Sequence, residues 1–498
     1  MTIPKYLLTT CISVLLSATL VAESFDDYVQ GEMKAFKAYK DALDKEFSDY
    51  LNQPWKSFKS VKSEPKLDPK PKTIPAIKTV KIIKVPGKAP IKKPLIDIPV
   101  VKKEVKIPVI KKLPPVVPVA VVVPKAKVTP KTVDASKSAV NFYGHVLYIQ
   151  YSNPLENIYA TMINKNKMKS AWDKLATSEY VELVKQVQDT IKVLNLNDWG
   201  RIKLLEKIGQ KVFRNKNEAR LFTWFVFTKL KYDIKVGFTR QHVVMLTPIN
   251  TMVYSTTFFT IDNKKYFAID FTNSKTNLSK IRTYEKSHPR AKSNFDLRID
   301  KRPKLKQVKA TKKVAFKFND RNYKLDIDYD KVYVAYYRNY PQVAYPNYFR
   351  APVSPLANVS IRNNIAKLVA GKGEVEAVNL LLRLVQRGFE YQIDETQFRR
   401  EKVMLPEETL YYPYSDCEDR AILFSKLVRD LLGLEVVGIK FPAHLATAVV
   451  LKSKLSGGTT FVKNGKRYYM ADPTYMGADV GMMPARYKGV KFEVIHAR

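Results

Sequence analysis

Apolar residues recur every three or four positions near the start of the chain, with Lys, Asp and Glu between them. The apolar positions are Phe25, Val29, Phe36, Tyr39, Leu43, Phe47 and Tyr50. This period predicts an amphipathic helix within residues 23–60, ending near Pro54. We expect its apolar stripe, over residues 24–59, to pack against the same protein or a second copy, with binding to a membrane surface as the alternative.

The helical pattern is lost over residues 61–136, where Pro, Lys, Val and Ile dominate, as in "KLPPVVPVAVVVPKAKVTPK". Proline interrupts helices and has no backbone N–H to donate, so this composition predicts an extended, polyproline-like linker. At about 3.1 Å per residue, such a linker reaches on the order of 200 Å. Its composition resembles that of the stalks of envelope proteins that cross a periplasm.

Helical and strand patterns alternate from residue 137 to the end, which predicts an α+β fold. We expect two tandem domains, at residues 137–294 and 351–498, joined by a small β connector at 295–350. Within the connector, apolar residues alternate on both sides of Asn319–Asn322. This alternation around a turn predicts a β-hairpin.

The first 22 residues combine a Lys near the start, a long apolar run and a small last residue, Ala22. This order predicts a secretory signal peptide over residues 1–22. The alternatives are an uncleaved membrane anchor and a lipid attached to Cys11. After cleavage Cys417 is the only thiol, so no intramolecular disulfide can form.

The chain carries 86 Lys and Arg against 47 Asp and Glu, a net charge of +39. Such a charge suits an anionic partner. Because part of it lies in the linker, we expect contact with an anionic polymer of the cell envelope and no binding to nucleic acid. Together with the signal peptide, this predicts a periplasmic or cell-envelope location.

The C-terminal region repeats an earlier part of the chain. The matching positions are Asn217 and Cys417, His242 and His444, and Asp270 and Asp472. The His and the Asp are 28 positions apart in both copies, and a helix, a strand and a hairpin surround them in the same order. The repeat predicts a duplicated fold, with chance similarity of two such units as the alternative.

Three residues of the second copy suggest nucleophilic catalysis. Ser415 or Asp416 is a suitable N-cap, which places Cys417 in the first turn of a helix where the helix dipole favours a thiolate. His444, on an apolar strand, could serve as the general base, and Asp472, at the end of a later strand, could orient its ring. Each residue alone has a structural explanation, as an inert core thiol, a core histidine or a turn. Their order and placement together favour a Cys-His-Asp triad.

At these residues the sequence resembles the transglutaminase-like superfamily, in which a Cys on a helix is followed by a His on a strand and an Asp at a strand end. The matching segments are Asp416–Ala421, Leu431–Leu434, His444 and Ala471–Thr474. The resemblance covers residues 360–480 and, through the repeat, extends to residues 190–275. It implies two papain-like domains and attack of Cys417 on an amide carbonyl, with His444 as base and Asp472 as orienter. Ser415 departs from the usual Gly before the motif, and Leu445 and Ala446 follow His444 in place of an aromatic residue, which leaves substrate preference open.

The first copy departs further from this pattern, because Asn217 cannot form a thioester. If Phe213 corresponds to Tyr391, the first copy also lacks the loop that walls a substrate cleft. We therefore expect the first domain to be degenerate, with Asn217, His242 and Asp270 as the counterparts of a lost triad.

The sequence predicts an exported thiol enzyme acting on amide bonds of envelope proteins or peptides, by hydrolysis or by acyl transfer. The alternative is an inactive scaffold whose two domains bind partners. No cofactor is expected, and the scattered histidines fit no spacing of metal ligands.

Overall fold

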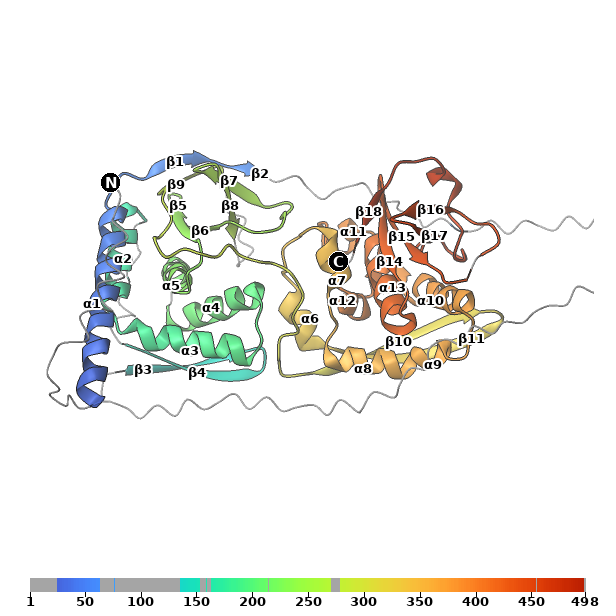
Figure 1. The fold of residues 1–498 in the computed structure, drawn as a ribbon, viewed down its shortest axis with the longest axis horizontal. Coiled ribbons are helices and arrows are strands. Elements are labelled where there is room, and N and C mark those ends of the chain that lie inside the picture. The colour runs from blue at the N-terminus through green and yellow to red at the C-terminus, as the bar shows by residue number, and fades with distance from the viewer. Residues whose placement is uncertain are drawn as a thin grey trace, which may run out of the picture.

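The computed structural model describes residues 25–62, 76, 135–152, 158, 163–213, 215–269, 278–453 and 455–496. Within them helices and β-sheets are mixed, which confirms the predicted α+β class. Figure 1 shows two lobes side by side, each with a sheet, a group of helices and a long hairpin. The predicted signal peptide, nearly all of the predicted linker and Asp270 lie outside the described residues.

The first lobe is built from the N-terminal helix and from residues up to about 300. Its elements are α1 (Phe25–Leu51), β1 (Lys56–Lys59), β2 (Val61–Lys62), β3 (Ala135–Phe142), β4 (His145–Ser152), α2 (Lys165–Thr177), α3 (Tyr180–Val193), α4 (Asp198–Val212), α5 (Lys216–Lys229), β5 (Lys235–Phe238), β6 (Val243–Thr247), β7 (Thr257–Ile261), β8 (Lys264–Ile269) and β9 (Lys280–Thr283).

The second lobe follows the same plan with more elements. They are β10 (Lys309–Phe318), β11 (Arg321–Asp330), α6 (Lys331–Tyr337), α7 (Tyr345–Arg350), α8 (Pro355–Asn364), α9 (Ala366–Val369), α10 (Glu374–Gly388), β12 (Glu390–Tyr391), α11 (Asp394–Phe398), α12 (Pro406–Tyr411), β13 (Tyr414–Ser415), α13 (Cys417–Leu432), β14 (Val436–Phe441), β15 (His444–Val450), β16 (Thr460–Lys463), β17 (Lys466–Ala471), a 3₁₀ helix (Ala485–Tyr487) and β18 (Glu493–Ile495).

The two lobes share one sheet topology. The strand order β9-β5-β6-β8-β7 of the first lobe has its equivalent in β18-β14-β15-β17-β16 of the second. The register agrees as well: Met245 pairs with Ile269 and, 202 positions later in both strands, Thr447 pairs with Ala471. A common strand order and register are what the predicted duplication requires.

Helix α1 ends at Leu51, earlier than expected, and the residues that follow form strands β1 and β2 on the two edges of the first-lobe sheet. The second half of α1 packs on its own protein: the ring of Phe47 lies 4.7 Å from those of Trp172 and His288. The predicted end near Pro54 is therefore three residues late, and the residues after Trp55 pair with the sheet edges. Met33, Phe36 and Tyr39, in the first half of α1, are exposed.

The predicted hairpin forms, with β10 and β11 paired from Lys309 and Asp330 to Phe318 and Arg321 at the turn. Its buried side chains, among them Val314 and Phe316, lie in the hydrophobic core of the second lobe. The hairpin thus belongs to this lobe and does not connect the halves as expected. Figure 1 shows it beneath the second lobe, as β3–β4 lies beneath the first.

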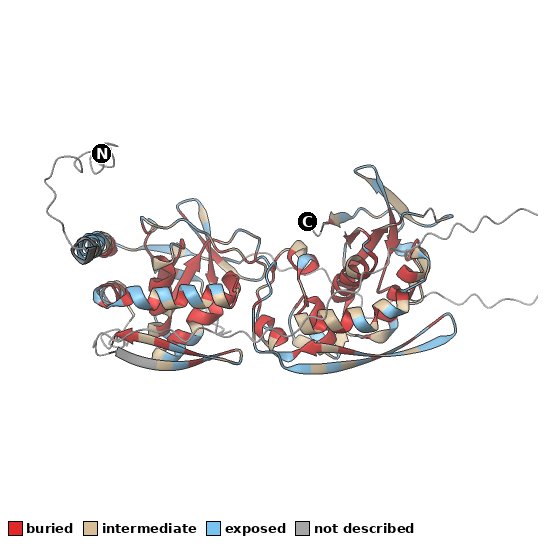
Figure 2. Cartoon of the chain, turned by 60° about the horizontal axis from the view of Figure 1, so that its bottom comes forward, coloured by how far each residue is buried: buried red, intermediate tan, exposed pale blue. Residues whose placement is uncertain are grey.

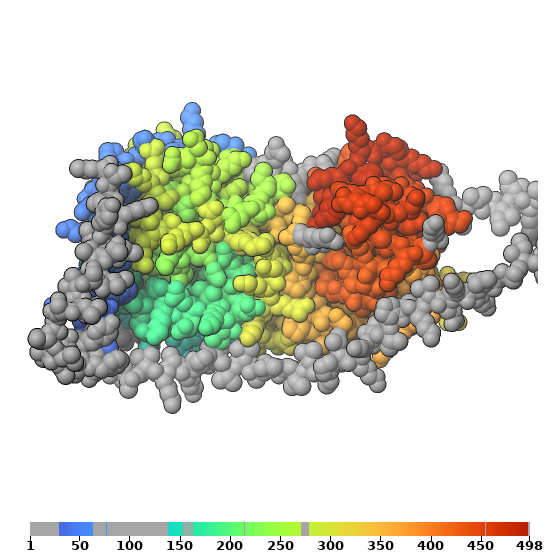
Figure 3. All heavy atoms as spheres, in the orientation of Figure 1, coloured from blue at the N-terminus to red at the C-terminus, as the bar shows by residue number. Residues whose placement is uncertain are grey.

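Helices α6 and α7 lie between the lobes, where Figure 3 shows yellow and orange residues filling the space between green and red. Tyr336 and Tyr337 of α6 are fully buried, and the indole of Trp199 donates to the carbonyl of Tyr336 at 3.0 Å. One hydrophobic core extends from the first lobe to Ala421 and Leu445 of the second. The lobes therefore pack as one unit.

Figure 2 shows that the central helices and strands are almost wholly buried, whereas residues 30–39 of α1 and the tip of the β10–β11 hairpin are exposed. Among the described residues no helix has both the length and the apolar character needed to cross a bilayer. Ala76, inside the predicted linker, forms an isolated parallel bridge with Met476 of the second lobe.

The buried His288 should make the first lobe sensitive to acid. Burial lowers its pKa from 6.5 to about 3, helped by the positive charges of Lys229 and Arg290. Below pH 6.5 the unfolded chain gains a proton that the folded chain excludes, so the stabilisation present above pH 6.5 is lost as the pH falls toward 3. Each pH unit in this window costs up to about 1.4 kcal/mol.

We expect His288→Phe to reduce this acid-induced loss, measured as the free energy of urea unfolding at neutral pH and in the acid window. His145→Gln, on the surface hairpin, is the control and should keep the wild-type loss. Equal losses in the wild type and His288→Phe would contradict the prediction.

Candidate active site

The start of α13 carries the predicted nucleophile. Asp416 is the N-cap, Cys417 is the first helical residue, and Gly433 ends the helix in the left-handed conformation at φ +63°. The Asp419 carboxylate accepts from the Asp416 N–H at 3.1 Å and from the Met404 N–H at 2.8 Å. The helix start is thereby capped and tied to the preceding segment, and its N-terminal partial positive charge lies at the thiol.

Arg420 holds the helix start against α10. Its side chain is fully buried and donates to Ser415 Oγ at 3.2 Å and to the carbonyls of Gln386 and Phe389 at 3.4 and 2.5 Å. Desolvation lowers its pKa from 12.5 to about 10, against the opposing effect of Tyr391 and the acidic groups around it. Arg420 therefore remains a cation at neutral pH, beside Cys417.

His444 and Asp472 form a direct pair. His444 opens β15, and its Nε2 lies 2.8 Å from Asp472 Oδ2, with both side chains buried. The other carboxylate oxygen accepts from the Thr474 N–H at 2.8 Å, and Gln386 donates to the Asp472 carbonyl at 3.1 Å. His444 Nδ1 has no hydrogen-bond partner within the described residues, so this nitrogen is open to a further partner.

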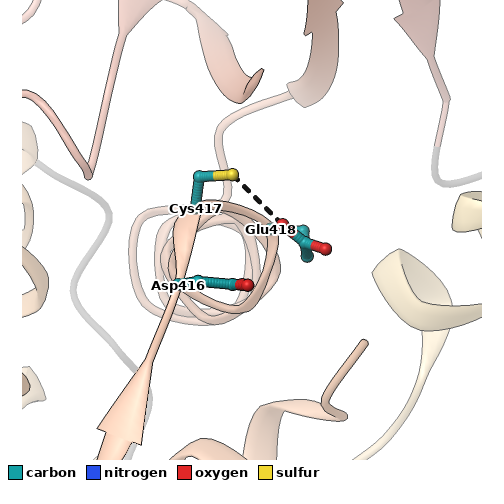
Figure 4. A group of neighbouring side chains, drawn as sticks. All are labelled: Asp416, Cys417 and Glu418. Carbon is teal, nitrogen blue, oxygen red and sulfur yellow. Dashed lines mark hydrogen bonds between the residues drawn. The ribbon is translucent and has the colours of Figure 1, made fainter. Parts of the chain in front are cut away.

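The Cys417 thiol donates to Glu418 Oε2 at 3.1 Å, as Figure 4 shows. Sequence analysis did not identify Glu418 as part of the site, since an acidic residue in the first turn of a helix is explained by the helix dipole alone. In this conformation the thiol is a hydrogen-bond donor. Conversion to a thiolate would place it between Arg420, which attracts it, and Glu418, which repels it when ionised.

Tyr487 is a second residue that sequence analysis missed. Its ring stacks on that of His444, with centroids 5.0 Å apart and planes at 11°. Burial raises the pKa of Tyr487, Arg486 opposes this shift, and the charges of Asp472 and Cys417 add to it. Tyr487 is therefore near all three predicted triad residues, on a segment whose position only the fold reveals.

The site is closed in this structure. Cys417 is 1% exposed, His444 3% and Asp472 1%. A groove of about 960 Å³ lies far along the molecule, between α1 and the α2–α3 region. A molecule from solvent reaches the Cys417 side chain only after a covering segment moves.

The segment before α13 packs against the start of that helix, where ligand atoms of Asp394, Glu401 and Glu418 lie within 4.8 Å of one another. It contains β12, α11, α12 and β13, and Glu407 of α12 anchors it by accepting from the N–H groups of Asp330 and Ser354 at 2.7 and 2.6 Å. Desolvation raises the pKa of Glu407 to about 7. Buried ionisable groups therefore hold the segment in place.

The first lobe has no such segment between α4 and α5. Phe213 follows the end of α4 in extended conformation, as Phe389 follows the end of α10. The structural counterpart of Phe213 is thus Phe389, and its expected match to Tyr391 is wrong by two positions. The difference arises because β12, which contains Tyr391, belongs to the inserted segment.

Asn217 and His242 of the first lobe lie side by side. The Asn217 amide donates to the Gln241 carbonyl at 3.2 Å and accepts from the Val243 N–H at 2.9 Å, bonding the backbone on both sides of His242. His242 directly precedes β6, whereas His444 begins β15. Asp270 lies outside the described residues.

Carboxylates gather around the thiol: ligand atoms of Asp416, Cys417 and Glu418 lie within 4.8 Å of one another, as do those of Asp394, Asp416 and Asp419. Backbone N–H groups bond the Asp419 carboxylate, and the charge of Arg420 opposes those of Asp416 and Asp419. Comparison with protein families, curated proteins and solved structures finds no match to this chain.

Removal of Arg420 should destabilise the second lobe strongly. Arg420→Met leaves two buried carbonyls and Ser415 Oγ without their donor and removes the cation among buried carboxylates, which typically costs more than about 3 kcal/mol. The measurement is the free energy of unfolding in urea. The matched control is Arg220→Met at the equivalent position of the first lobe, where the side chain is only partly buried and donates to the Val243 carbonyl, so a smaller loss is expected. Equal losses would refute this role for Arg420.

Proposed function

We propose that this chain is a thiol enzyme with two transglutaminase-like domains, the first degenerate, which acts on amide bonds of proteins or peptides. The observation that carries the proposal is the buried His444–Asp472 pair at 2.8 Å, with the second ring nitrogen left open and the only thiol of the described residues at the start of the adjacent helix. Helix α13 packs against β15, which begins with His444.

The reaction follows from these groups. His444 Nδ1 takes the proton of the Cys417 thiol, and the sulfur attacks the amide carbonyl carbon. The tetrahedral oxyanion is held by backbone N–H groups at the start of α13. The imidazolium then protonates the departing amine, which leaves a thioester on Cys417.

A second acceptor completes the cycle. His444 takes a proton from water or from an amine, the acceptor attacks the thioester, and the thiol re-forms as it leaves. Water yields a carboxylic acid, so the enzyme acts as a peptidase or amidase; an amine yields a new amide. Asp472 keeps Nε2 protonated and stabilises the imidazolium throughout.

The cell envelope is the proposed location of this chemistry. The signal-peptide pattern and the basic linker composition support it, with envelope proteins or peptides as substrates and an anionic polymer as the partner of the linker. We also propose that α1 associates with a partner, because its side chains Met33, Phe36 and Tyr39 are apolar and exposed.

The second candidate is an inactive scaffold in which both lobes bind partners. Two observations favour it: the triad residues are closed off, and the thiol donates to Glu418. The two functions differ in the reactivity of Cys417.

Thiol labelling separates them. In the chain beginning at residue 23, labelling of Cys417 by iodoacetamide, located by peptide mapping, should be at least about ten times faster for the wild type than for His444→Ala at pH 6. His242→Ala is the matched control and should label as the wild type does. An inert thiol, insensitive to His444→Ala, would favour the scaffold.

Mass spectrometry of peptides carrying Gln, Asn and internal amide bonds should show cleavage, loss of ammonia or a new amide, according to the acceptor. We expect Cys417→Ala to abolish the product and His444→Ala to slow it by at least about 100-fold. Asn217→Cys, tested together with Cys417→Ala, should not restore it, because the first lobe lacks the inserted segment. Product formation in that double variant would contradict the assignment of the first lobe as degenerate.

A further inference from the structure

Tyr487 is a buried residue with exposed neighbours on both sides. Ala485, Arg486, Lys488 and Gly489 are exposed, whereas Tyr487 is 8% exposed. The Tyr487, Lys488 and Val490 N–H groups donate to carbonyls within the turn that these residues form. The turn thus places the Tyr487 ring in the interior, and the contacts of that ring show its role.

The ring packs on the first residue of β15 and on its cross-strand neighbour. Its centroid lies 5.0 Å from that of His444, with the planes at 11°, and 4.7 Å from that of Phe441, with the planes at 25°. Phe441 and His444 are paired residues of β14 and β15. Rotation of the imidazole out of its plane would therefore require Tyr487 to move.

The plane of the His444 imidazole determines whether the ring can bond Asp472, because Nε2 lies at the carboxylate only in this orientation. A hydrogen bond between a histidine and a carboxylate is weakened by water, which competes for both partners. An aromatic ring at stacking distance excludes water from one face of the imidazole. The Arg486 guanidinium lies 4.8 Å from the centre of the Tyr487 ring and adds a cation on the outside.

We propose that Tyr487 is a positioning residue for His444: its ring holds the imidazole in the plane that bonds Asp472 and shields that bond from water. This inference rests on the proposed function of the triad. The ring, and not the hydroxyl, makes the contact, so Tyr487→Phe retains the effect and Tyr487→Leu removes it.

Two measurements on the chain beginning at residue 23 test this role. The first is the exchange of the His444 imidazole N–H with water, followed by NMR with ¹⁵N-labelled histidine. We expect exchange at least about ten times faster in Tyr487→Leu than in the wild type, and unchanged in Tyr487→Phe. The second is the pH profile of iodoacetamide labelling at Cys417, which in Tyr487→Leu should shift toward that of His444→Ala.

Phe461→Leu is the matched control. The Phe461 ring stacks on Tyr468 at 5.1 Å within the same hydrophobic cluster, so its loss perturbs this core away from His444. Wild-type exchange and labelling in Tyr487→Leu would overturn the inference, and so would equal effects in Phe461→Leu. The proposed function is tested separately. If exchange is faster in Tyr487→Leu but Cys417 labelling does not change in His444→Ala, Tyr487 shields the His444–Asp472 bond and the catalytic triad is refuted.

Discussion

The structure of the second lobe depends on hydrogen bonds and ion pairs that compensate the buried charges at the start of α13. Asp416, Glu418, Asp419 and Arg420 are at most 1% exposed, a position where unpaired charges cost several kcal/mol each. The Arg420 guanidinium donates to the Phe389 carbonyl at the end of α10. The Asp419 carboxylate caps its own helix and accepts from the Met404 N–H. The same bonds that pair these charges set the place of Cys417. The site is therefore rigid on its helix side, and access to it depends on the segments that cover it.

The two lobes show how one scaffold supports different sites. Sheet order and register agree between them, and Asn217 stands at the helix start where Cys417 stands in the other copy. Its amide bonds the backbone on both sides of His242, so this position forms a structural link in the first lobe. The second lobe also has the inserted segment before α13, which the first lobe lacks. The side chain at the helix start and the inserted segment are thus two of the differences between the copies.

The lobes are not independent, because α6 inserts aromatic side chains between them. Tyr336 and Tyr337 are fully buried, and the Trp199 indole of the first lobe bonds the α6 backbone. The guanidinium of Arg429, on α13, donates to the carbonyl of Phe349 on α7. The helix that carries Cys417 is therefore braced against the junction between the lobes.

The amino-acid sequence by itself determined the local features. The 3.6-residue period and the capping residues placed Cys417 at a helix start, because these signals depend only on near neighbours along the chain. The internal repeat, which is read by comparing the sequence with itself, placed His444 on a strand and Asp472 directly after one. The tertiary structure alone decided which distant segments meet. It made Lys56–Lys59 an edge strand of the first-lobe sheet, placed the hairpin in the second lobe, and brought Tyr487 onto His444. No periodicity encodes these contacts, because each depends on the burial of surfaces supplied by residues far apart in the chain.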